Sequence, residues 1–362
     1  DGTCTANLTN RTNKNLIING AMQVAQRGSS VAVSDGSNEG YQSLDRYKTY
    51  TNNSGAYTVS QDTDVPTDYS FGRFKKSYKV DVTTADTSIG SSDLIRVEQD
   101  IEAQDIGSSG WDYSSSSGKI TLSFWVKSVK AGTYVVVIQT VDGTAYSYAI
   151  EYTLSANTWT HVSKTIPGNS NLTIDDDNGA GLKIHWILCS GSDNNLTADT
   201  WTSGLKYGTT NQANLFDSTS NNWYLTGVQL EVGSVATDFE HKCYQEELYR
   251  CYRYYYRYTV PTSNSWVWMG QSNGSDKIWG KIRDFPVLMR ATPTCTISGG
   301  AWYPIGANQS VGGHSPFDTF NFNNTTTEKL YATWSGAAGI DTDAVVVFAN
   351  TVTDYFDASA EL

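Results

Sequence analysis

Four aromatic residues lie in segments that are otherwise too polar to form a hydrophobic core. Trp111 and Tyr113 belong to GSSGWDYSSSSG, and Trp201 and Tyr207 belong to TADTWTSGLKYGTT. The face of a Trp or Tyr ring can pack against the C–H groups of a sugar, while nearby amides and carboxylates bind its hydroxyls. We therefore predict that these four side chains are exposed on loops and form a carbohydrate-binding site. The alternative is that they pack against neighbouring loops or a partner chain.

A second group of aromatic residues lies toward the C-terminus. Trp266, Trp268 and Trp279 flank GQSNGSDK, and Trp302-Tyr303 follow a Gly-Gly turn. The sequence does not decide which of the two groups binds a ligand.

Charged residues alternate with uncharged ones along one predicted strand. The charged set, on one face, is Arg96, Glu98, Asp100 and Glu102. Carboxylates two positions apart on a strand are about 7 Å apart, a separation at which glycosidases use paired carboxylates. The outer face of a sheet usually carries charges, however, so we favour a solvent-exposed face over sugar binding or catalysis. We predict that the protein is not an enzyme.

One acidic loop offers ligands for a metal ion. Asp175, Asp176, Asp177 and Asn178 precede the predicted strand LKIHWIL. Clustered carboxylate oxygens suit Ca²⁺, although the loop lacks the spacing of an EF-hand. A structural calcium ion is one interpretation, and a solvated turn is the other. No cofactor is required.

Other catalytic or metal-binding patterns are missing from the sequence. The four histidines, which are His161, His185, His241 and His314, lie in separate segments without Cys or carboxylate at metal-ligand spacing. No nucleophile elbow, phosphate-binding loop or dinucleotide fingerprint is present. The five scattered cysteines leave one unpaired and predict free thiols rather than a disulfide framework.

Hydrophobic residues repeat with a period of two, which is typical of β-strands. In Ala145–Leu154, apolar or aromatic residues at every second position alternate with Ser147, Glu151 and Thr153. An Asp142-Gly143 pair predicts a hairpin before this strand. We expect about ten strands between Asp45 and Glu231, and a jelly-roll sandwich is the common arrangement for so many short strands.

The composition narrows the range of partners. Charged residues make up only 17% of the chain and the net charge is -12. This charge argues against binding to nucleic acid or to an anionic membrane surface. No apolar run approaches the roughly 20 residues that a membrane-spanning helix needs, so we expect no membrane insertion.

The patterns predict an all-β chain with several parts. Residues 1–14 are expected to be a linker, 15–238 a jelly-roll β-sandwich, 239–258 a short connecting helix and a strand, and 259–362 a second, smaller β domain. The apolar run Val345–Phe348 predicts a strand buried on both sides, with another subunit as one cover.

Two stretches resemble one family. NLIINGAMQVAQRG (Asn15–Gly28) and YLTGVQLEVGSVATDFEHKCYQEELYRCYRYY (Tyr224–Tyr255) are similar to C-terminal regions of bacteriophage tail fibre and tail tip proteins, including those of cyanophages. LIRVEQDIEA and ITLSFWVKS look like the carbohydrate-binding-module-like sandwich of that family. The resemblance covers nearly the whole chain, most weakly over residues 260–340.

The resemblance implies a homotrimeric fibre tip that binds host surface polysaccharide or lipopolysaccharide during adsorption. It implies a virion location, synthesis in the host cytoplasm, and attachment to other tail proteins through an upstream region. It supplies no binding residues. A depolymerising tailspike and a purely structural virion fibre or capsid-associated protein remain alternatives, although no repeating rungs of a β-helix are found.

Overall fold

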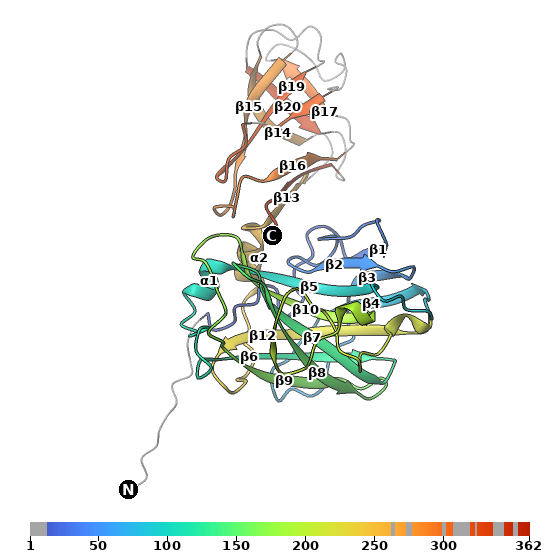
Figure 1. The fold of residues 1–362 in the computed structure, drawn as a ribbon. Helices are drawn as coiled ribbons and strands as arrows, with labels where there is room; N and C mark the ends of the chain where they lie inside the picture. The colour runs from blue at the N-terminus through green and yellow to red at the C-terminus, as the bar shows by residue number, and fades with distance from the viewer. Residues whose placement is uncertain are drawn as a thin grey trace. The chain divides into compact units, whose positions relative to one another are not determined.

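The computed structural model describes residues 13–261, 265–272, 277–298, 302–306, 319–322, 324–335, 344–349 and 354–362 (Figure 1). Residues 1–12 of the predicted linker, with Cys4, and His314 lie outside these ranges. The chain divides into two compact units, the first ending at Glu247 and the second spanning Leu248–Glu361. Antiparallel strands dominate both units, so the all-β prediction is confirmed.

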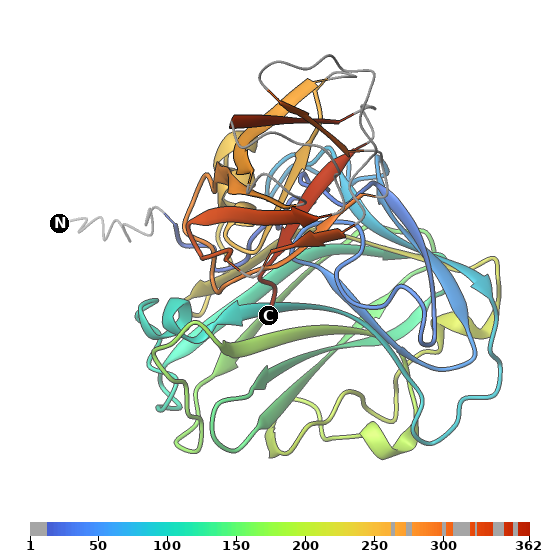
Figure 2. The ribbon, with the colours of Figure 1, turned by 90° about the horizontal axis from the view of Figure 1, so that it is seen from above.

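The first unit is a jelly-roll sandwich of two six-stranded sheets. The first sheet contains, in spatial order, β1 (Ser30–Ser34), β3 (Ala56–Asp62), β4 (Ser77–Thr84), β12 (Asn222–Val232), β6 (Lys119–Ser128) and β9 (Thr160–Pro167). The second contains β11 (Trp201–Ser203), β8 (Tyr146–Leu154), β7 (Gly132–Thr140), β10 (Ala180–Ser190), β5 (Leu94–Glu102) and β2 (Lys48–Asn52). Figure 2 shows strands of the second sheet side by side.

Short helices connect strands of this unit. They are α1 (Ala103–Gly107) and two 3₁₀ turns, η1 (Ser192–Asn194) and η2 (Leu215–Asp217). Within the described residues, no helix has the length and apolar character needed to cross a membrane.

The core between the two sheets follows the period of two in the sequence. On β8, Tyr148, Ile150, Tyr152 and Leu154 are all buried in it. β7 and β8 form the predicted hairpin, with Thr140 opposite Tyr146. Gly143 in the connecting loop has φ +60°, a left-handed conformation that glycine adopts without steric cost. The sequence pattern thus identified the inner face of this hairpin correctly.

The second unit contains two further antiparallel sheets. The three-stranded sheet contains β13 (Tyr255–Thr259), β21 (Tyr355–Ser359) and β16 (Thr294–Ile297). The six-stranded sheet contains β17 (Trp302–Gly306), β20 (Ala344–Ala349), β14 (Ser265–Ser272), β15 (Lys277–Asp284), β19 (Lys329–Ser335) and β18 (Thr319–Asn321). The predicted short helix is α2 (Tyr244–Tyr252), which precedes β13. The helix and the second, smaller β region are therefore confirmed.

The run Val345–Phe348 lies in β20, which pairs with β14 on one edge and β17 on the other. Its backbone is thus central in the sheet. The side chains of this strand lie outside the described residues, so the expected burial on both faces stays a prediction.

Candidate functional site

The four aromatic residues of the polar loops do not form an exposed cluster. Trp111 is only 4% exposed and belongs to the core of the sandwich, and Tyr113 and Trp201 pack against that core. Trp201 donates a hydrogen bond from Nε1 to the backbone oxygen of Pro167 at 2.8 Å. The expected exposure of Trp111 is therefore wrong. Its polar neighbours in the sequence do not prevent its own ring from turning inward.

The C-terminal aromatic group contains both buried and exposed side chains. Trp268 and Trp302 are buried in the core of the second unit, whereas Trp279 is 44% exposed. The side chains of Trp266 and Tyr303 lie outside the described residues.

The acidic loop before β10 does not form a cage of ligands. Asp175, Asp176 and Asp177 are all exposed, and Asp177 accepts a local hydrogen bond from the backbone N–H of Gly179. Among the described residues, no three His, Cys, Asp or Glu side chains are grouped so as to hold a metal ion. The geometry adds no support to the calcium interpretation.

The charged face of β5 is buried, contrary to the expectation of a solvated face. Glu98 and Asp100 are 2% and 1% exposed, and Glu102 is buried as well. Lys48 of β2 places its Nζ 2.8 Å from Glu98 and 2.7 Å from Asp100. Cations on the same and neighbouring strands offset the cost of removing the carboxylates from water. We call Lys48, Arg96, Glu98, Asp100, Lys183 and His185 the charged network.

Two more contacts fix Glu98 within the charged network. Its Oε2 lies 2.5 Å from Arg96 Nε and 2.9 Å from His185 Nδ1. Burial favours the protonated acid, but His185, Arg96 and Lys48 outweigh it and hold the pKa of Glu98 well below its ordinary value. At neutral pH this carboxylate is ionised, so it has no proton to give to a leaving group.

A surface segment, residues 191–213, covers the charged network. The ring centre of Tyr207 lies 4.5 Å from Arg96 Cζ and 5.4 Å from the His185 ring. Gln139 Oε1 forms a hydrogen bond of 2.9 Å with His185 Nε2. Gln139 Nε2 donates to the backbone oxygen of Lys206, also at 2.9 Å. The charged network is thus joined directly to this segment, and Tyr207 has a structural contact in place of an exposed stacking face.

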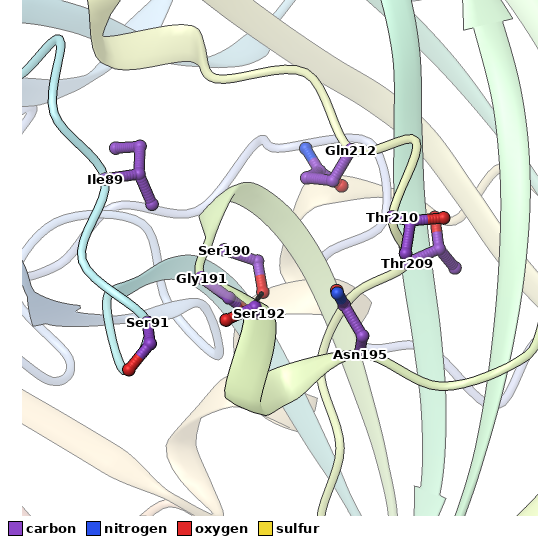
Figure 3. A pocket seen from close by; sticks show the side chains of 9 residues that line it. All are labelled: Ile89, Ser91, Ser190, Gly191, Ser192, Asn195, Thr209, Thr210 and Gln212. Atoms are coloured by element: carbon purple, nitrogen blue, oxygen red, sulfur yellow. Dashed lines mark hydrogen bonds between the residues drawn. The ribbon is translucent and has the colours of Figure 1, made fainter.

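Both ends of the same segment help to form a pocket of about 500 Å³ (Figure 3). A pocket of this size is within the range that small ligands occupy. Its lining residues are Ile89, Ser91, Ser190, Gly191, Ser192, Asn195, Thr209, Thr210 and Gln212. Seven of these side chains carry a hydroxyl or an amide, and none is ionisable.

Backbone hydrogen bonds hold the stretches that form the pocket together. The N–H of Gly191 donates to Asp93 and that of Asp193 donates to Ser91, each at 2.8 Å. A Cβ at position 191 would lie 2.1 Å from the backbone oxygen of Gly90, so glycine is needed for this close approach. Leu196 donates to Gly208 at 2.8 Å and joins the two ends of the segment. The pocket therefore has a fixed frame.

Several polar groups of the lining are left without a partner. The side chains of Ser192, Asn195 and Thr210 make no hydrogen bond within the described ranges. Gln212 Oε1 is buried and likewise accepts no hydrogen bond from the described residues. The unpaired side chains at the pocket surface, Ser192, Asn195 and Thr210, can instead exchange bound water for the hydroxyl groups of a ligand.

The lining is suited to binding rather than to bond cleavage. It contains no carboxylate, histidine or lysine that could transfer a proton. The neighbouring thiol of Cys189 is buried, and burial together with Asp93 and Asp86 raises its pKa to about 12. That thiol stays protonated and is a poor nucleophile.

The pocket was missed in the sequence because its residues have no distinctive chemistry. Ser190–Asn195 and Thr209–Gln212 read as ordinary polar turns. The nearest usable signal was the high content of Ser, Thr and Asn in two stretches that flank Trp201 and Tyr207.

No protein-family model and no curated protein matches the sequence. Solved structures with some similarity to this chain include the enzymatically active domain of bacteriophage CBA120 tailspike protein 4. That domain is 14% identical, with 61% of this chain and 22% of that chain covered and a TM-score of 0.31. The chain thus spans about a fifth of that domain.

Two smaller proteins are covered almost completely. The family 11 carbohydrate-binding module of a Clostridium thermocellum cellulase is 15% identical, with 57% and 96% covered and a TM-score of 0.30. A putative sugar binding protein from Bacteroides thetaiotaomicron is 11% identical, with 60% and 100% covered and a TM-score of 0.31. Similarities this low carry no argument about ligand or activity.

Proposed function

We propose that the first unit binds a glycan in the pocket between residues 89–91, 190–195 and 209–212. The observation that carries the proposal is the lining of this open pocket of about 500 Å³, which has seven hydroxyl- or amide-bearing side chains and no ionisable group. Sugar hydroxyls both donate and accept hydrogen bonds, so they match such a lining. Trp201 and Tyr207 support the segment that carries the lining.

Substitution of Asn195 tests this proposal. Asn195→Ala removes a free amide from the pocket, and the loss of one or two hydrogen bonds should weaken binding about five- to tenfold. Retention on surface polysaccharides and lipopolysaccharides of candidate bacterial hosts, followed by calorimetry with the retained glycan, measures the change. Asn171→Ala, at an exposed loop position outside the pocket, is the matched control. Unchanged binding by both Asn195→Ala and Thr210→Ala would exclude the pocket.

We also propose that the chain is the receptor-binding part of a phage tail fibre or spike. The support is the resemblance of Asn15–Gly28 and Tyr224–Tyr255 to that family. The host glycan would then be met at the virion surface, and an upstream region would bind other tail proteins. Antibodies against this chain should label the tail tip of the particle. Label elsewhere would favour the structural virion component.

A homotrimer fits this role. Met269 and Trp279, on the neighbouring strands β14 and β15, are 71% and 44% exposed, which leaves apolar surface for a second copy. Three linked sites would raise the apparent affinity by effective concentration. Light scattering at micromolar concentration should give three times the mass of one chain.

We propose no hydrolytic activity. Glu98 is buried and held ionised by Arg96, Lys48 and His185, and the pocket lining lacks an acid–base pair. Incubation with host polysaccharide should release no reducing ends. Release that disappears in Glu98→Gln or Asp100→Asn would replace this proposal with a depolymerising tailspike.

A further inference from the structure

Gln212 belongs to the pocket lining, and its side-chain amide has a fixed orientation. Its Nε2 donates to the backbone oxygens of Ile187 at 3.1 Å and Ala213 at 2.8 Å. Exchange of the amide nitrogen and oxygen would place Oε1 against two carbonyl oxygens, so these contacts determine the orientation. Oε1 is buried without a donor among the described residues. Oε1 has almost no accessible surface, so a ligand group reaches it only after a shift of the lining. Such a group has to be a donor, and a hydroxyl fits whereas an ionised carboxylate does not.

Two carboxylates lie directly behind the lining. Ser91 donates from Oγ to Asp193 Oδ2 at 2.8 Å, and Thr209 donates from Oγ1 to Glu151 Oε1 at 2.5 Å. These two lining hydroxyls are therefore already oriented by carboxylates. Lys206 is also close to this frame and keeps its positive charge, since its ammonium donates to the backbone oxygen of Asp193, but it is not part of the lining. An anionic sugar entering the pocket would approach carboxylates without a cation in the lining to pair with.

We infer that the pocket takes a neutral sugar unit through its hydroxyl groups and rejects units that carry carboxylate, sulfate or phosphate. The inference rests on the proposed glycan binding and narrows the class of glycan. It concerns the unit inside the pocket, so a polysaccharide with acidic units elsewhere in its repeat still binds.

The test compares neutral and acidic glycans on one array. The array carries hexose oligosaccharides beside uronate-containing, sulfated and phosphorylated counterparts of similar length. The wild-type chain should be retained by neutral members, and its affinity for them should change less than twofold between low and high salt. Thr210→Lys places an ammonium at an exposed position of the lining. It should gain at least fivefold retention on acidic members, whereas Thr83→Lys, an exposed threonine on β4, should not.

The possible failures can be told apart. If acidic glycans bind more tightly than neutral ones and Asn195→Ala abolishes that binding, the pocket is a glycan site and only the neutral class is overturned. If no glycan depends on Asn195 or Thr210, the proposed function fails and the inference fails with it. A thermal unfolding midpoint equal to that of the wild-type protein establishes that each variant is folded. If Asn195→Ala does not fold, Thr210→Ala at the exposed position replaces it.

Discussion

The charged network and the pocket are both polar, and both contact residues 191–213, but Glu98 of the network and the neutral groups of the pocket differ in their hydrogen bonding. In the network, Glu98 contacts three partners, Lys48, Arg96 and His185. In the pocket, the side chain of Asn195 and the oxygen of Gln212 have no partner among the described residues. The carboxylate of Glu98 is therefore paired without a ligand, although Asp100 Oδ1 in the same network is buried without a partner among the described residues. The unpaired side chain of Asn195 lies at a surface that a ligand can reach.

The difference follows from the energies of charged and neutral groups. An ionised carboxylate removed from water needs partners at once, because burying an isolated charge is very costly. A hydroxyl or amide at a surface pocket can stay hydrated until a ligand replaces the water. A dense group of charged residues therefore stabilises the interior here, whereas unpaired neutral groups at the surface of a pocket are available to a ligand.

The largest expected effect is on the charged network. Glu98→Gln leaves Lys48 and Arg96 near a neutral amide, and breaking a buried pair of this kind costs about 3–5 kcal/mol of unfolding free energy. Asp81→Asn is the control, because Asp81 pairs with Lys79 and its side chain is 45% exposed. This exposed pair should cost less than about 1 kcal/mol. Urea unfolding followed by tryptophan fluorescence measures the free energy of unfolding of both variants. Equally small losses in the two would contradict the view that the charged network stabilises the interior.

A slightly smaller loss of stability is expected when an aromatic residue of the polar loops is replaced, and this loss distinguishes a structural role from a role in ligand binding. Trp111→Ala should destabilise the first unit by about 3 kcal/mol, because it removes a core side chain that is 4% exposed. Trp201→Ala should cost less, since that ring is only half-buried. Trp111→Ala should keep the wild-type affinity for glycan at temperatures where it is folded, and Trp201→Ala should lose affinity only as far as the supported segment is loosened. A strong loss of glycan binding without a loss of stability would show that these rings contact the ligand after all.

Acidification should weaken the charged network before it affects the pocket lining, which has no titratable group. Burial lowers the pKa of His185 below its ordinary value of 6.5, against the opposing effect of Glu98. The pKa of Glu98 lies well below 4.5. Because the unfolded chain binds more protons than the folded chain at both groups, stability falls as the pH falls.

The decline should begin below about pH 6.5 through His185 and steepen below about 4.5 as Glu98 titrates toward its folded pKa. Thermal unfolding from pH 8 to pH 4 measures it. In Glu98→Gln the loss of stability below about pH 4.5 should be smaller than in the wild-type protein. Because Gln139 links His185 to Lys206 of the segment, glycan affinity should fall only where stability falls. A loss of affinity at full stability would mean that an ionisable group lies in the site.

Local patterns in the sequence were sufficient for much of the fold. The alternation in β8 identified its inner face, since successive side chains of a strand point to opposite sides. Gly143 marked a hairpin, and the change of pattern after Tyr252 separated α2 from β13. Each of these features depends on residues that are close in the chain.

The candidate site was harder to predict because other parts of the chain decide burial. Trp111 stands among serines and glycines, yet its ring enters the core. Glu98 alternates as an outer-face residue should, yet Tyr207 and the Lys206 backbone cover that region of the sheet. For Glu98 the side-chain direction was predictable and the neighbours that cover it were not. For Trp111 the direction itself was not predictable, because the residue lies outside a regular strand and no alternation determines which way its ring points.

The sequence alone determined that this protein is a β-sandwich joined through a short helix to a second β region. It also determined a polar, weakly charged chain with free cysteines. Only the tertiary structure decided that the charged strand face is closed and that residues 89–91, 190–195 and 209–212 form one pocket. Strand periodicity is a property of the local backbone, whereas a pocket requires three distant stretches to meet and leave polar groups unpaired.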